Sequence, residues 1–189
     1  MTVTGINTAG TQGNATFSAN GAFTFNPAPG YEGTTTFTYT VSDGTFSNTG
    51  TVSITVTGMI WFINAGAAGG GDGRLSNPFN NMNTFNGISS DDPGDNIFVY
   101  TGTYTNTTTT TLLGNQNLIG QGAVGTLASL AGVTFSVHPP VGNAIPGVGG
   151  TNPIINQAGN SLVLGSNNEN LQSFIFASPF LQRLRKAAL

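Results

Sequence analysis

The densest group of reactive side chains in the sequence is an acidic turn, in which Asp91, Asp92 and Asp95 surround a Pro-Gly pair. Closely spaced carboxylates can bind calcium or serve as the acid and base of a glycosidase. The simpler interpretation is a polar turn before the apolar run at Ile97, in which Asp95 accepts hydrogen bonds from nearby backbone N–H groups. We favour the turn, and weak calcium binding is the one cofactor interaction that the sequence leaves open.

The other residues that could do chemistry stand alone in the sequence. His138 is the single histidine and precedes two prolines, whereas a metal site needs several ligands. Asp72 and Arg74 flank Gly73 in a glycine-rich loop, which lacks the lysine and the spacing of a phosphate-binding loop. Trp61 lies in an apolar run, which favours a buried ring over a ring that stacks on sugars. We therefore expect no catalytic, cofactor-binding or metal-binding residue.

A threonine-rich stretch at residues 101–111 suggests two interpretations. Aligned hydroxyl groups could form a flat face for sugars or ice, but such a face needs the same pattern in every repeat, and the pattern does not recur. We expect a solvated strand surface instead. Glycosylation sequons begin at Asn14 and Asn106, and they matter only in a eukaryotic secretory pathway, so we assign them no function.

The composition limits the class of protein. The chain has 189 residues, of which 38% are hydrophobic and only 6% are charged, and it contains no cysteine. Abundant glycine, threonine and asparagine favour strands and turns, so we expect an all-β fold with enough apolar residues for a core. The absence of cysteine excludes a disulfide scaffold and thiol catalysis.

The distribution of charge argues against nucleic acid as a partner. Three of the four bases lie in the last seven residues, which leaves one base against seven acids, a charge of −6, in the rest of the chain. Nucleic-acid binding depends on clustered lysine and arginine. No stretch of about 18 apolar residues and no signal sequence is present, so we expect no membrane span and see no export signal.

Residues 15–56 show the alternation of apolar and polar side chains that is typical of strands with one buried face. Turn signals separate the strands at residues 20–21 (NG), 26–30 (NPAPG) and 42–44 (SDG). The pattern predicts an antiparallel meander. Its apolar positions include Phe17, Phe23, Phe25, Phe37, Tyr39, Val41, Val52, Ile54 and Val56.

Three stretches of this segment resemble bacterial cadherin-like or Ig-like tandem modules: residues 25–33 (FNPAPGYEG), 37–44 (FTYTVSDG) and 52–56 (VSITV). The resemblance implies a β-sandwich of the kind that is strung in series on large surface and secreted proteins. A complete sandwich needs about seven strands in roughly 100 residues. We therefore expect residues 1–57 to form a partial module, without the Asp-rich stretch that would carry calcium binding.

The sequence pattern changes at a boundary near Gly58. The second segment begins with a short apolar run at residues 61–64 (WFIN), which predicts a strand. Asn77 as N-cap and Pro78 at the first helical position predict one short helix. Its apolar stripe recurs at intervals of three residues: Phe79, Met82, Phe85 and Ile88. Short apolar runs separated by Gly, Asn and Pro then follow, at residues 96–100, 117–119, 133–137, 153–155, 162–164 and 174–176.

The short runs favour a solenoid over a second sandwich. The segment resembles the N-terminal cap and first coils of right-handed parallel β-helices, of the pectin-lyase type, in autotransporter-like adhesins. The matching stretches are residues 61–64, 71–73, 77–79, 93–104 and 118–122. We expect residues 58–176 to form this β-helix with one short capping helix.

Residues 177–189 form a basic tail unlike the rest of the chain, and they are helix-prone. As a helix, they would gather Phe180, Leu181, Leu184 and Ala188 on one side. A helix of this length is marginal in water and short for membrane binding. We interpret the tail as a dispensable terminus or a cover over the last coil near Phe174 and Phe176.

These observations favour a non-enzymatic, structural or adhesive fragment of a large exported bacterial protein, located outside the cell or on its surface. Its expected partners are glycans or other surface molecules. One alternative is a polysaccharide lyase or hydrolase built on the β-helix. Another is a self-assembling extracellular filament subunit, because an incomplete sandwich and an open coil expose strand edges that can pair with other copies.

Overall fold

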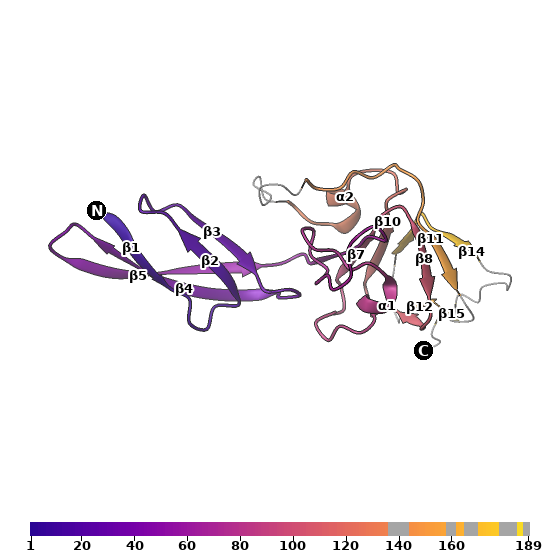
Figure 1. Cartoon of the computed structure of the whole chain (residues 1–189), viewed down its shortest axis with the longest axis horizontal. Coiled ribbons are helices and arrows are strands. Elements are labelled where there is room, and N and C mark those ends of the chain that lie inside the picture. The colour runs from indigo at the N-terminus through magenta and orange to yellow at the C-terminus, as the bar shows by residue number, and fades with distance from the viewer. Residues whose placement is uncertain (136–143, 158–161, 165–169, 178–184, 187–189) are drawn as a thin grey trace. The chain divides into compact units, whose positions relative to one another are not determined.

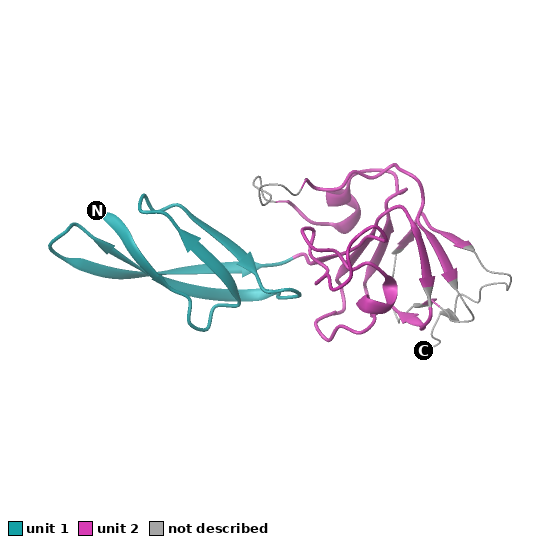
Figure 2. Ribbon diagram, viewed as in Figure 1, with its two compact units in different colours: residues 1–57 teal, residues 58–189 magenta. Residues whose placement is uncertain are grey.

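The computed structural model describes residues 1–135, 144–157, 162–164, 170–177 and 185–186. The chain divides into two compact units, unit 1 at residues 1–57 and unit 2 at residues 58–189 (Figure 2). The regular elements of the described residues are strands, apart from two very short helices, so the expected all-β class is confirmed.

Unit 1 contains five antiparallel strands in two sheets (Figure 1). One sheet has the order β1-β4-β5 and the other is the β2–β3 hairpin. The strands are β1 (Thr2–Asn7), β2 (Gly13–Phe17), β3 (Phe23–Pro27), β4 (Gly33–Ser42) and β5 (Ser47–Val56).

The predicted meander is wrong in its connectivity, because β4 pairs with β1 and not with β3. The β2–β3 hairpin forms a second layer, in which the rings of Phe23 and Phe37 meet edge to face at 5.5 Å. Two layers bury apolar side chains between them, whereas a single meandering sheet would leave that face in water. The sequence signal for the hairpin turn is confirmed, since the N–H of Gly21 donates to the carbonyl of Ser18 at 2.9 Å.

Among the described residues of unit 2, every pair of neighbouring strands is parallel, and these strands form three sheets. Their orders are β13-β10-β7-β6, β14-β11-β8 and β15-β12-β9. The strands are β6 (Ile60–Ile63), β7 (Asn96–Val99), β8 (Thr103–Asn106), β9 (Thr110–Thr111), β10 (Asn117–Gly120), β11 (Ile154–Gln157), β12 (Leu162–Leu164), β13 (Asn170–Gln172), β14 (Ile175–Ala177) and β15 (Arg185–Lys186).

The register of these sheets aligns apolar side chains from successive strands in one core. Trp61, Ile97, Leu118 and Leu171 occupy equivalent positions in the first sheet, and Tyr104, Ile155 and Phe176 do so in the second. Phe62, Phe98 and Ile119 alternate with the first set and belong to a separate cluster with helix α2 (Leu127–Ala131). This sheet is buried on both faces, which explains why its strands are continuous apolar runs.

The predicted helix at residues 77–88 is much shorter in the structure, where α1 spans Met82–Phe85 and Asn81 is its N-cap. Asn77 is not a cap, because its N–H donates to the carbonyl of Arg74 in a tight turn. Phe79 is extended and exchanges hydrogen bonds with the edge of β6, donating to Phe62 and accepting from Asn64. Pairing with this edge satisfies backbone groups that a longer helix would leave open.

Helix α2 was not predicted, although its signals are present in the sequence. Thr126 is the N-cap and accepts a hydrogen bond from the N–H of Ser129 at 3.1 Å, and Gly132 ends the helix with a φ of 65°. The predicted strand at residues 133–137 is wrong for residues 133–135, which follow the helix without strand structure. The N–H of Val133 instead closes the helix end by donating to Ala128.

The basic tail departs from the predicted helix where the structure describes it. Arg185–Lys186 form β15, which pairs parallel with β12. A strand edge offers backbone partners, whereas an isolated helix of this length has little stability in water. The rest of the tail, including Phe180, Leu181, Leu184 and Ala188, lies outside the described residues.

Candidate functional sites

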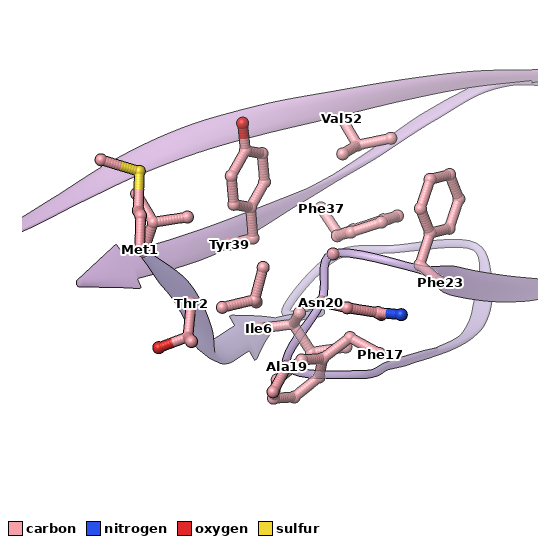
Figure 3. A pocket seen from close by; sticks show the side chains of 13 residues that line it. Met1, Thr2, Ile6, Phe17, Ala19, Asn20, Phe23, Phe37, Tyr39 and Val52 are labelled. Carbon is pink, nitrogen blue, oxygen red and sulfur yellow. The ribbon is translucent and has the colours of Figure 1, made fainter. Parts of the chain in front are cut away.

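An apolar groove of about 430 Å³ opens between the sheets of unit 1 (Figure 3). Phe37 and Tyr39 of β4 and Val52 of β5 line it, together with Phe17 and Phe23 from the β2–β3 hairpin. Phe23 is 48% exposed, so the sandwich is open at this point. The lining contains no Asp, Glu, Lys, Arg or His side chain, and the groove offers mainly hydrophobic contact.

The acidic turn of unit 2 is built around a buried carboxylate. Asp95 is 3% exposed, and its Oδ2 accepts hydrogen bonds from the Trp61 Nε1–H at 2.8 Å and from the Asp92 N–H at 3.0 Å. The predicted local backbone bond of Asp95 is confirmed, and so is the burial of Trp61. The sequence did not predict the hydrogen bond between the Trp61 indole and the Asp95 carboxylate, because the two residues lie 34 positions apart.

Asp91 is joined to a fully buried glutamine. Its Oδ1 accepts a hydrogen bond from Gln116 Nε2 at 2.6 Å, while Gln116 Oε1 accepts the Leu113 N–H at 2.7 Å. Burial raises the pKa of Asp91 to about 6, with a smaller contribution from the charges of Asp95 and Asp92, and the Gln116 hydrogen bond opposes the rise. The charge of Asp91 therefore changes at about pH 6.

These carboxylates are arranged to hold a turn. Asp91 and Asp95 both direct oxygens to protein donors, and no group of three His, Cys, Asp or Glu side chains among the described residues could hold a metal ion. The two oxygens that accept from Trp61 and Gln116 stabilise the chain before β7. The weak calcium binding that the sequence left open remains a prediction.

The glycine loop with Asp72 and Arg74 also has structural contacts. The Arg74 Nε lies 3.7 Å from Asp72 Oδ2, and the carbonyl of Gly73 accepts the N–H of Phe62. Gly73 has a φ of 79° and packs directly against the ring of Phe79, so this position tolerates no side chain. His138, the other isolated candidate, lies outside the described residues.

The threonine-rich stretch does not form a repeating hydroxyl face. Thr103 and Thr105 are exposed on β8, but their partners in β11 are Ile154 and Asn156. The register therefore breaks the hydroxyl pattern at the next strand, as the sequence suggested. Of the two sequons, Asn14 lies exposed on β2 and Asn106 ends β8.

Two asparagines that the sequence analysis did not single out join α1 to residues 108–109 of the threonine-rich stretch. Asn83 Oδ1 accepts the Thr108 Oγ1–H at 2.9 Å, and Asn86 Nδ2 donates to the carbonyl of Thr109 at 3.1 Å. Asn83 and Asn86 stand three positions apart, so they project from the same side of a helical turn. The spacing could have indicated that the two side chains share a face, but it does not indicate which residues they contact.

The comparison with known families identifies one part of the chain. Residues 1–58 match the bacterial cadherin-like domain, and this matched range includes all of unit 1. Domains of this class are typically extracellular or associated with the cell surface. No curated protein matches the chain. No solved structure matches it either.

The two described helices are far too short to cross a bilayer, at four and five residues.

Proposed function

We propose that the chain is a non-enzymatic segment of an exported bacterial surface protein, in which a cadherin-like module leads into a stalk used for adhesion or display. The observation that carries this proposal is the match of residues 1–58 to the bacterial cadherin-like domain. Domains of this class are typically parts of extracellular or cell-surface proteins. The open groove of unit 1, which has no charged side chain in its lining, supports binding by hydrophobic contact more than it supports catalysis.

The stalk is a parallel β-helix of the type that the sequence resembles. In support, β7, β8 and β9 pair with β10, β11 and β12 in the same order. Asn96 lies opposite Asn117, and Ile154 opposite Ile175, so two coils each advance by 21 residues (117 − 96 and 175 − 154). Asn117 also donates to the side chain of Asn96 at 2.8 Å, which ties equivalent corners of neighbouring coils together.

The assignment as a non-enzyme draws support from the carboxylates. A glycosidase needs two carboxyl groups facing its substrate, whereas Asp91 and Asp95 accept hydrogen bonds from Gln116 and Trp61. The proposed partners are uncharged glycans or other surface molecules, because hydroxyl and amide side chains dominate the exposed strands and charges are few.

Binding of the labelled full chain to bacterial and host cells and to a glycan array tests the proposal. We expect saturable binding that is lost when the chain is heat-unfolded, with an unrelated β-protein of similar net charge as control. A parallel screen on pectin, alginate and host glycans measures turnover. Turnover that disappears in Asp91→Asn and Asp95→Asn, without saturable surface binding, would replace the adhesive function with the enzymatic alternative.

A further inference from the structure

Strand β5 leaves one long edge open in unit 1, all of whose residues are described. Its ladder with β4 runs without interruption through ten pairs, from Gly33↔Val56 to Ser42↔Ser47, and no other strand of unit 1 pairs with it. The strand contains no charged residue and no proline. Proteins commonly use charges, prolines, bulges or covering segments to prevent edges from pairing, and β5 has none of them in unit 1.

The opposite edge of the same sheet differs. The ladder of β1 with β4 is interrupted between Val3 and Gly5, and the N–H of Val3 donates to the carbonyl of Ala19 at 3.1 Å. The bulge and this contact with the hairpin make the β1 edge less able to pair with another strand. The β5 edge is therefore the better template for a further strand.

The hydrogen bonds fix which backbone groups of β5 point outward. The Asp43 N–H donates to the Phe46 carbonyl, so even-numbered residues of β5 direct their backbone groups toward β4 and odd-numbered residues direct them away. The outward N–H of Thr49 is taken by Asn48 Oδ1 at 2.8 Å. Beyond this point the outward groups belong to Thr51, Ser53 and Thr55, a set that is symmetric about Ser53.

We propose that β5 pairs antiparallel with β5 of a second copy of this chain, with the two-fold axis at Ser53. In this register Ser53 lies opposite Ser53 of the partner, and Thr51 lies opposite Thr55. Each outward N–H and C=O of the three residues then finds an acceptor or donor in its symmetry mate, which is the self-complementarity that an isologous dimer requires. The two three-stranded sheets become one continuous sheet.

The side chains of β5 suit the same register. Val52 meets Ile54 of the partner on the half-buried face that borders the groove, and threonines meet on the exposed face. No charges oppose one another, and the two chains leave the paired strands at opposite ends. A strand-edge contact is small by the standard of stable interfaces, so dimerisation should depend on protein concentration. This inference goes beyond the proposed adhesive function and does not depend on it.

Cysteine cross-linking of the otherwise cysteine-free full chain tests the register. The Ser53→Cys variant should form a disulfide-linked dimer under mild oxidation, because cysteines on the axis lie within bridging distance. Thr55→Cys is the matched control on the same face and should form no disulfide-linked dimer when it is oxidised alone. Mixed with Thr51→Cys, it should form the linked heterodimer. Equal cross-linking of Ser53→Cys and Thr55→Cys, or none by Ser53→Cys, would overturn the proposal.

Charge variants provide a second measurement that needs no covalent bond. Ser53→Lys should shift the molar mass from dimer to monomer in light scattering, and mixing it with Ser53→Glu should restore the dimer. Thr36→Lys is the control, because Thr36 is exposed and neighbours Ser53 within the sheet but lies away from the edge. A wild-type chain that is monomeric at all concentrations, or a dimer unaffected by Ser53→Lys, contradicts the pairing.

Discussion

The carboxylates of this chain differ in what the fold does to their charge. Asp91 is held in partly buried surroundings that raise its pKa, whereas Asp43 lies exposed in a turn. The Oδ1 of Asp43 accepts the N–H groups of Phe46 and Thr45 at 2.8 and 2.9 Å, and these bonds lower its pKa. Burial thus opposes the charge of one residue, and backbone donors favour the charge of the other.

Replacing Asp91 by Asn should stabilise the protein at neutral pH. The pKa of Asp91 is raised from 3.8 to about 6, so the stability that its protonated form contributes is complete below pH 3.8 and is lost as pH rises through about 6. Asn keeps an oxygen for Gln116 and carries no charge at any pH. Urea unfolding should show Asp91→Asn above wild type at pH 7.5 and equal to it near pH 4.

The matched control is Asp43→Asn, for which the sign is reversed. The lowered pKa of Asp43 contributes stability that is present above pH 3.8 and is lost as pH falls through the folded-state pKa. This variant should therefore be less stable than wild type at pH 7.5. Equal stability of Asp91→Asn and wild type at pH 7.5 would mean that burial of Asp91 does not disfavour its charge.

Two short segments cover the unit 2 core beside β6, which is the first strand of that unit. Residues 73–79 cover the edge of β6, and α1 adds Met82 and Phe85, both 1% exposed. The ring of Phe85 lies 6.4 Å from that of Trp61 and 6.5 Å from that of Phe79. A helix of four residues owes its stability to these contacts and not to its own hydrogen bonds.

Phe85→Ala should destabilise unit 2 strongly. Removing a buried phenylalanine costs about 3–5 kcal/mol of unfolding free energy, from lost apolar contact and the cavity that remains. Phe46→Ala is the control, because Phe46 is 76% exposed, and its change should stay within about 0.5 kcal/mol. Thermal and urea unfolding measure both variants. Similar small effects would show that α1 is not part of the core.

Thr126→Ala tests the capping of α2. The Thr126 Oγ1 accepts the N–H of Ser129, and its loss should cost about 1 kcal/mol. Thr126→Ser keeps the acceptor and should restore most of this stability in the same denaturation experiment. If Ser and Ala variants behave alike, the helix end is held by packing and not by its cap.

For the whole molecule, we expect stability that does not depend on calcium. The described carboxylates offer fewer clustered oxygens than the 6–8 ligands that calcium takes, and those of Asp91 and Asp95 already accept protein hydrogen bonds. Melting temperatures should agree in the presence of calcium and of a chelator, with magnesium as the ionic control. A large upward shift that saturates at micromolar calcium would reveal a site that we have not recognised.

The sequence by itself determined the local features of this protein. Alternating side chains and Asn-Gly or Asp-Gly turns predicted the strands of unit 1 within residues 15–56, because the period of two and the turn conformations depend on neighbouring residues. Strand β1 was not predicted. Short apolar runs likewise predicted the strands β6, β7 and β10. The capping signals of α2 were equally local, and they could have been read from Thr126 and Gly132.

Only the tertiary structure decided which distant segments meet. The choice of β1 over β3 as the partner of β4, the hydrogen bond of Trp61 to Asp95, and the contact of Asn83 with Thr108 each join residues that lie more than 20 positions apart. Such pairings depend on how apolar faces are buried together and on which backbone and side-chain groups must find partners out of water. Those demands are set by the whole packed unit, and no local pattern contains them.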